Sequence, residues 1–140
     1  MPFPPRYLVV TDLDGSLLDD SYSWEAARPA LERLKAMEIP LVLNSSKTVE
    51  EMAQLASDLG TPTSLVAENG GLVAVPDAQG KYETQITGLS REFILEKAHA
   101  LRTVDGFAFS GYADWSVEQI AECTGLSLEM AARSAARSAT

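Results

Sequence analysis

The sequence has one cysteine, one histidine and few basic residues, and each shortage narrows the classes of protein to consider. Cys123 alone cannot form an internal disulfide, so a reducing cytoplasm is the natural location. Eleven Lys and Arg stand against twenty Asp and Glu, and the net charge of −9 disfavours nucleic acid and anionic membranes as partners. His99 has no cysteine or carboxylate at ligand spacing, so we expect a surface or packing role for it.

Long hydrophobic runs are also missing. Residues 1–6 lack the apolar core of a signal peptide, and no run approaches the roughly 20 residues that a membrane-spanning helix needs. With 140 residues, 46% of them hydrophobic, the chain can bury one core, and we expect a soluble, cytoplasmic protein. We find no internal repeat, and low complexity is confined to the alanine-rich end.

Short apolar runs alternate with helical patterns, which predicts an α/β fold with a parallel sheet and helical crossovers. The first expected strand, 7–10, is interpreted as a central, buried strand. Further strands are expected at 41–43, 64–67, 72–75 and 106–110. Helices are expected at 24–37, after Thr48, after Ser90, at 117–123 and after Ser127. A turn-rich tip at 77–81 is expected to lead out of the core sheet.

Two carboxylates, Asp12 and Asp14, follow the first expected strand. Ligands of α/β sheets bind at the carboxyl ends of the strands. If the backbone stays extended, both carboxylates point one way and Leu13 the other, and Gly15 permits a sharp turn. Two acids this close repel each other when ionised, so the pair favours a divalent cation or a shared proton. A strand-to-loop turn with an aspartate cap is the alternative interpretation.

Hydroxyl groups and a lysine follow the second expected strand, in the stretch Asn44-Ser45-Ser46-Lys47-Thr48. Because the stretch leads into a helix, its hydroxyls, backbone amides and ammonium group can bind phosphate oxygens. Thr48 and Glu51 also form a capping-box pattern, so an ordinary helix start is the alternative. The two interpretations are compatible, since a capped helix N-terminus also favours an anion.

A third polar stretch, Glu68-Asn69-Gly70-Gly71, follows the third expected strand. Asn69 and Gly70 suit a plain hairpin turn. Glu68 would be electrostatically unfavourable near a phosphate site unless it contacts a lysine or a substrate hydroxyl. We therefore keep Glu68 as a candidate for substrate binding.

These stretches resemble the motifs of the haloacid dehalogenase-like phosphohydrolases. The run from Asp12 to Leu17 is similar to the first motif, with Ser16 in place of the usual threonine. The serines at 45–46 are similar to the second motif, and Glu68-Asn69-Gly70 resembles the loop of members whose large cap follows the third strand. The resemblance implies a Rossmann-like three-layer α/β/α core, of which 1–80 is the N-terminal part, and the start of an α/β cap at 81–140.

The resemblance also implies roles for individual residues. Asp12 would be the nucleophile that forms an aspartyl-phosphate, and Asp14 the acid and base. Mg²⁺ would be held by the Asp12 carboxylate and the Asp14 backbone carbonyl. Phosphate or substrate contacts would come from Ser45, or Ser46 in the alternative register, with Lys47, Glu68 and Asn69.

Within the family, the stretch Ser45-Ser46-Lys47-Thr48 resembles the mannosyl-3-phosphoglycerate phosphatase branch of the capped subfamily IIB, where most relatives read Thr-Gly-Arg. The stretches 106–116 and 123–127 resemble the cap of the same branch. The resemblance implies a Mg²⁺-dependent hydrolase of a small phosphate ester, mannosyl-3-phosphoglycerate. It also implies a later lysine and acidic pair, which the sequence after residue 116 does not supply, so we expect the N-terminal half of such an enzyme.

Two alternatives stay open. The chain could be a truncated, non-catalytic phosphate-binding or interaction module, or the substrate could be a sucrose, trehalose or other hexose phosphate. No oligomeric state follows from the sequence. Arg133 and Arg137 lie one helical turn apart and could grip a carboxylate or phosphate, although a solvated helix face is the simpler interpretation.

Overall fold

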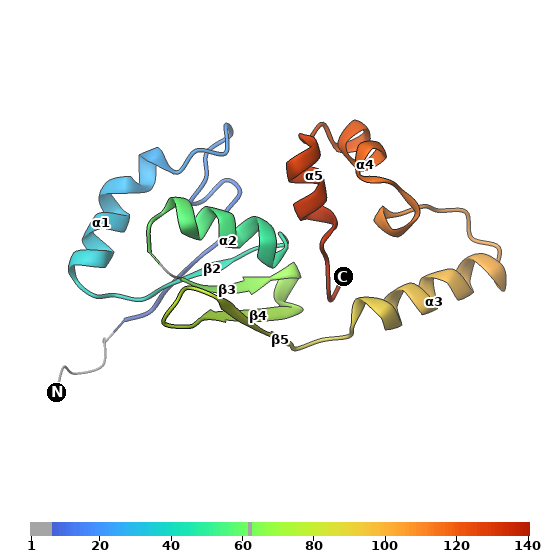
Figure 1. Ribbon diagram of the computed structural model, residues 1–140, viewed down its shortest axis with the longest axis horizontal. Coiled ribbons are helices and arrows are strands. Elements are labelled where there is room, and N and C mark those ends of the chain that lie inside the picture. The colour runs from blue at the N-terminus through green and yellow to red at the C-terminus, as the bar shows by residue number, and fades with distance from the viewer. Residues whose placement is uncertain (1–6, 62) are drawn as a thin grey trace.

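The computed structural model describes residues 7–61 and 63–140, and its strands form one mixed sheet. Residues 1–6, where no signal peptide is expected, lie outside the described residues. In order across the sheet, the strands are β1 (Val9–Thr11), β2 (Leu41–Asn44), β3 (Ser64–Ala67), β4 (Leu72–Pro76) and β5 (Tyr82–Ile86) (Figure 1). β1, β2 and β3 run parallel, whereas β4 and β5 are antiparallel to their neighbours. The predicted α/β class is confirmed.

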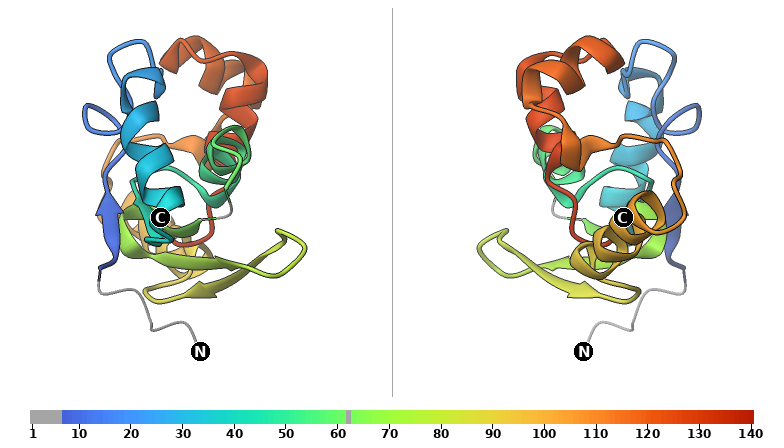
Figure 2. Two further views of the ribbon diagram at one scale, coloured as in Figure 1. Left: turned by 90° about the vertical axis from the view of Figure 1, so that its left-hand side faces the viewer. Right: turned by 90° about the vertical axis from the view of Figure 1, so that its right-hand side faces the viewer.

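Helices connect the parallel strands on one face of the sheet. The short 3-10 helix η1 (Glu25–Ala27) leads into α1 (Arg28–Ala36), and α2 (Val49–Asp58) follows β2. Because crossovers between neighbouring parallel strands are right-handed, α1 and α2 lie on the same face (Figure 2). Pro29 lies in the first turn of α1, where its missing N–H is tolerated.

Three further helices follow β5 and gather at one end of the sheet. They are α3 (Arg91–Thr103), α4 (Val117–Thr124) and α5 (Leu128–Ala135), and the short 3-10 helix η3 (Tyr112–Asp114) precedes α4. Another 3-10 helix, η2 (Glu68–Gly70), lies earlier in the chain, between β3 and β4. Ser90 and Ser127 cap α3 and α5 as predicted. α5 packs on α4 and on α2, so it stands next to the carboxyl end of β2 (Figure 1). In the described residues no helix is both long and apolar enough to cross a membrane.

The core lies between the sheet and α2. Leu43 of β2 and Leu65 of β3 are paired in register and have no exposed surface, and Met52 of α2 is equally buried. Each such side chain contributes roughly 1.5–3 kcal/mol by its burial. This packing holds the ends of β2 and β3 side by side, at the edge where the polar stretches begin.

The structure corrects the prediction that the first strand is central. Among the described strands β1 lies at the edge of the sheet, because only β2 pairs with it. Leu8 is 60% exposed and Val10 is 55% exposed. The apolar run that predicted a buried strand is therefore half uncovered in the described structure.

Two further expectations about strands were wrong. The tip at 77–81 does not lead out of the sheet but joins β4 to β5 within it. The sequence analysis did not predict β5, because its residues are mostly polar and exposed. The expected strand at 106–110 is absent from the described residues. A strand needs a partner for its backbone groups, but the amide of Phe107 donates to the carbonyl of Leu101 at the end of α3 instead.

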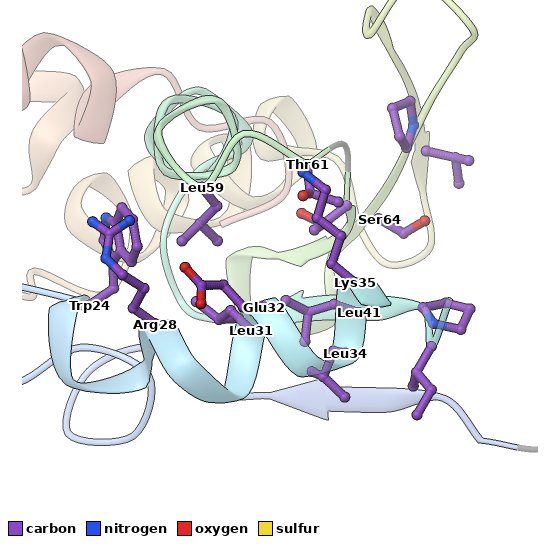
Figure 3. A pocket seen from close by; sticks show the side chains of 15 residues that line it. Trp24, Arg28, Leu31, Glu32, Leu34, Lys35, Leu41, Leu59, Thr61 and Ser64 are labelled. Carbon is purple, nitrogen blue, oxygen red and sulfur yellow. The ribbon is translucent and has the colours of Figure 1, made fainter. Parts of the chain in front are cut away.

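A cavity of about 490 Å³ lies between α1, the end of α2 and the amino ends of β2 and β3 (Figure 3). Leu31, Leu34 and Leu59 contribute apolar walls. At one end the Arg28 guanidinium lies 4.4 Å from the centre of the Trp24 ring. No residue of the three polar stretches lines this cavity, so it is separate from the candidate site.

Candidate functional site

The three polar stretches meet at the carboxyl ends of β1, β2 and β3. Thr11 pairs with Leu43, and Asn44 pairs with Val66, so the residues after each strand begin side by side. Backbone hydrogen bonds join the second and third stretches: Asn69 N donates to Ser45 O (3.2 Å) and Glu68 N to Lys47 O (2.9 Å). All three stretches therefore lie at one edge of the sheet, at the strand ends where ligands of α/β sheets bind.

Asp12 and Asp14 are exposed, while Leu13 between them is fully buried. This is the alternation that the sequence predicted. Gly15 adopts a φ of 75°, and the turn is closed by Leu18 N donating to Leu13 O at 2.8 Å. Within the described residues no hydrogen bond or ion pair engages the exposed Asp12 carboxylate.

Lys47 lies next to Asp14. Its Nζ is 3.2 Å from Asp14 Oδ2, and it sits 5.4 Å from the centre of the Tyr22 ring. Ser45 is buried, with its hydroxyl accepting the Lys47 amide at 3.3 Å, whereas Ser46 is exposed. The structure therefore joins the first and second stretches through an ammonium group with donors to spare for an anion.

Thr48 completes the start of α2. Its hydroxyl accepts the Glu51 amide at 3.2 Å, and Glu51 Oε2 accepts the Thr48 amide at 2.8 Å, so the predicted capping box is confirmed. Thr48 Oγ1 also donates to the carbonyl of Arg133 in α5 at 2.8 Å. The capped end of α2 is thereby tied to the later helices, a contact that the sequence did not predict.

Glu68 has a different partner from the one that the sequence suggested. Its side chain is buried, at 1% exposure, and in the described residues it forms no ion pair with a lysine. Its carboxylate accepts the amides of Ser138 and Ala139, each at 2.8 Å, and the hydroxyl of Thr140 at 3.1 Å. Sequence reasoning missed this contact because the partners lie about 70 residues apart in the chain.

Asn69 follows in a left-handed conformation. Its φ of 57° and the φ of 51° at Glu68 turn the chain between β3 and β4. The predicted hairpin turn at Asn69 and Gly70 is confirmed by the antiparallel pairing of β3 with β4. Among the described residues no side-chain contact of Asn69 points to a ligand, so its role in substrate binding stays a prediction.

The oxygen donors at the strand ends suit a hard cation such as Mg²⁺, provided that the protein supplies only part of its ligands. Among the described residues no group of three or more His, Cys, Asp or Glu side chains gathers to hold a metal ion. Mg²⁺ commonly keeps several waters and takes one or two carboxylates together with phosphate oxygens of the substrate. Asp12 and Asp14, exposed at the strand end, fit this requirement.

Farther along, Arg102 of α3 binds Asp114 of η3 through two hydrogen bonds of 2.7 and 2.5 Å. The guanidinium also lies 4.4 Å from the centre of the Phe109 ring. These bonds from Arg102, with one from the Gly111 amide, hold the pKa of Asp114 well below its usual range. The contact fastens the loop after α3 to the helix itself.

The chain matches one known family. Residues 9–132 match the profile of the haloacid dehalogenase-like hydrolases. A glucosyl-3-phosphoglycerate/mannosyl-3-phosphoglycerate phosphatase of Methanococcoides burtonii is 34% identical over 138 residues, which cover 90% of this chain and 51% of the relative. The chain thus spans about half the length of this curated relative.

Solved structures share the fold. A haloacid dehalogenase-like hydrolase from Bacteroides thetaiotaomicron matches 71% of this chain and 38% of its own length, with a TM-score of 0.55 and 21% identity. A haloacid dehalogenase-like hydrolase from B. subtilis matches 91% of this chain and 49% of its own, with a TM-score of 0.55 and 16% identity. At sequence identities this low, the similarity shows a shared fold and nothing about function.

Proposed function

The chain belongs to the haloacid dehalogenase-like hydrolases, and we propose that it carries the nucleophile half of a Mg²⁺-dependent phosphatase acting on a small phosphate ester. The observation that carries the proposal is the pairing of Lys47 with Asp14 beside an unengaged Asp12 carboxylate. These groups provide an anionic nucleophile, an acid and a cation at the neighbouring carboxyl ends of β1 and β2. That combination is what in-line displacement at phosphorus requires.

The residues divide the reaction between them. A carboxylate oxygen of Asp12 attacks phosphorus while the ester P–O bond breaks, and the leaving oxygen takes a proton from Asp14. Water then attacks the aspartyl-phosphate, gives a proton to Asp14 and releases phosphate, which restores Asp12. Lys47 first leaves Asp14 for the phosphoryl oxygens, since a phosphate dianion competes for the ammonium group.

Bound Mg²⁺ supplies positive charge that offsets repulsion between the phosphoryl group and the attacking carboxylate. The Asp12 carboxylate and the Asp14 backbone carbonyl would hold it. Ser45 or Ser46 donates a hydroxyl hydrogen bond to a phosphoryl oxygen, and Asn69 lies at the turn next to them. The Glu68 carboxylate is already occupied by backbone amides, so we assign it no substrate contact in this proposal.

We further propose mannosyl-3-phosphoglycerate, or its glucosyl counterpart, as the substrate. The support is the Ser45-Ser46-Lys47-Thr48 stretch and the phosphatase of M. burtonii, whose name carries both esters. A division into a core part at 1–80 and a cap part at 81–140 belongs to the same proposal, with β5 pairing to β4 across that boundary.

Phosphate release from mannosyl-3-phosphoglycerate in the presence of Mg²⁺ tests the proposal. Asp12→Asn should lower the rate by about a thousandfold or more, because the nucleophile is lost. Asp20→Asn is the matched control, since Asp20 is an exposed aspartate in the next loop and should leave the rate unchanged. Equal turnover by the Asp12 variant and the wild type would contradict the proposal.

A second candidate function is that of a phosphate-binding module, which the capped start of α2 and the Lys47 ammonium group would also support. Such a module would bind a phosphate ester without turning it over. Calorimetric binding of the ester, with no phosphate released and with equal affinity in Asp12→Asn, would favour this binding module over the phosphatase. Faster release from sucrose 6-phosphate would instead move the substrate to the hexose phosphates.

A further inference from the structure

The segment Arg137–Thr140 leaves α5 and returns to the strand ends that carry the candidate site (Figure 1). Glu68 holds it through the amides of Ser138 and Ala139, and the Ser138 carbonyl accepts the Arg91 amide at 2.8 Å. Ala139 is 5% exposed and joins the hydrophobic core. The segment is therefore fixed at both its backbone and its side chains.

This anchoring fixes Arg137 beside the second polar stretch. Its Nη2 donates to the carbonyl of Ser46 at 2.9 Å, and its Nε donates to the Thr140 hydroxyl at 2.7 Å. An arginine side chain has five N–H donors, so these two bonds leave three for a ligand. A guanidinium held in this way loses little conformational freedom when it binds.

Arg137 and Lys47 line one hollow of about 320 Å³ between the strand ends and helices α4 and α5. Tyr22 and Tyr112 also line it and add phenol groups that can donate hydrogen bonds. The one carboxylate in its lining, Glu51, is turned to the capping box of α2. The hollow therefore presents two cations. Lys47 is paired with Asp14, whereas no carboxylate of the described residues forms an ion pair with Arg137.

Arg133, one turn earlier on α5, gives the contrast. Its Nη2 lies 2.6 Å from Glu129 Oε1, so its charge is paired on the helix surface. Among the described residues Arg137 has no such carboxylate partner. The two arginines, which look equivalent in the sequence, are thus set apart by the structure.

We propose that this hollow binds a carboxylate carried by the same substrate whose phosphoryl group reacts at Asp12, with Arg137 as the residue that selects for it. The inference rests on the proposed function and names a feature of its substrate. Lys47 connects the two sites, because it pairs with Asp14 and also lines the hollow. A phosphoglycerate unit carries both anionic groups close together, whereas a hexose phosphate lacks the carboxylate.

The test compares two small esters that share a phosphate monoester but differ in the carboxylate: 3-phosphoglycerate and glycerol 3-phosphate. Affinities are measured by calorimetry with Mg²⁺ for the full chain and for Arg137→Gln, with Arg133→Gln as the matched control. The wild type should prefer 3-phosphoglycerate by about tenfold, as expected for a charge-assisted hydrogen bond. Arg137→Gln should bring the ratio of affinities close to one, while Arg133→Gln keeps it.

Arg137→Lys keeps the charge but not the planar fork, and should restore part of the preference. Equal affinity of the wild type for the two esters, or an unchanged ratio in Arg137→Gln, would overturn the inference and leave the proposed function standing. Failure of both esters to bind the wild type would contradict the proposed function, and the inference with it. Far-ultraviolet circular dichroism of each variant identifies a ratio lost through misfolding, in which case Arg137→Lys decides.

Discussion

Lys47 Nζ and Asp14 Oδ2 lie 3.2 Å apart, so the cation of the second polar stretch rests on an acid of the first. Both side chains are partly exposed, at 25% and 47%, and such a pair contributes no more than about 1 kcal/mol to stability. The ion pair therefore contributes little to the stability of the fold. In the proposed function it is a contact that the phosphate group of the substrate displaces.

Lys47→Gln should therefore separate binding from stability. We expect its KM for a phosphate ester to rise by about tenfold or more, because a charge-assisted contact to the anion is lost. The free energy of unfolding should change by less than about 1 kcal/mol. Urea denaturation and steady-state kinetics measure the two effects, and a large loss of stability with an unchanged KM would show that the pair is structural.

Glu68→Gln should destabilise the chain. The buried carboxylate accepts three donors, and an amide would turn its NH₂ group toward one of them, which costs about 1–3 kcal/mol. Glu129→Gln is the control, because Glu129 is 76% exposed and should cost under about 0.5 kcal/mol.

Hydrogen exchange of the Ser138 and Ala139 amides reports the same contact directly. We expect faster exchange at both in Glu68→Gln, with exchange in β2 and β3 much less affected. Unchanged protection of the two amides would mean that another group holds the segment Arg137–Thr140.

Acid should loosen the contact between α3 and η3. The pKa of Asp114 is lowered in the folded chain from its usual 3.8, mainly by Arg102. A lowered carboxyl pKa stabilises the fold at pH values above the unfolded pKa, and this contribution disappears as pH falls below about 3.8 through the folded value. Thermal unfolding from pH 2 to 7 should show wild type and Asp114→Asn converging at the acid end. Parallel curves would rule out this ion pair as the source.

Val10→Lys tests the exposed edge of the sheet. Val10 is 55% exposed on β1, so the substitution should change the free energy of unfolding by under about 0.5 kcal/mol. A lysine on an open edge strand opposes pairing with another chain. Sedimentation velocity over a range of concentrations should therefore show less association in the variant than in the wild type. Identical association would place any contact between copies elsewhere.

Features governed by neighbours in the sequence could be predicted. The capping box of Thr48 and Glu51 spans three residues, and the burial of Leu13 between exposed Asp12 and Asp14 follows from strand alternation. The meeting of the three polar stretches also follows, because parallel strands end at a common edge.

Features that depend on partners far apart in the sequence could not be predicted. β5 is polar and gains its structure from pairing with β4, so no apolar alternation marks it. The edge position of β1 depends on which strands flank it, which no local pattern records. The partner of Glu68 is a stretch of backbone amides, and amides occur at every position of a sequence. Only the fold distinguishes those of Ser138 and Ala139.

The most direct test of the account is the location of the phosphoryl group during a single turnover. The full chain is mixed with Mg²⁺ and mannosyl-3-phosphoglycerate, quenched in acid, digested and examined by mass spectrometry. The account predicts a phosphorylated peptide with the modification on Asp12 in the wild type and in Asp20→Asn, and none in Asp12→Asn. Phosphate released without any phosphoryl group on Asp12, or equal release by Asp12→Asn, would contradict it.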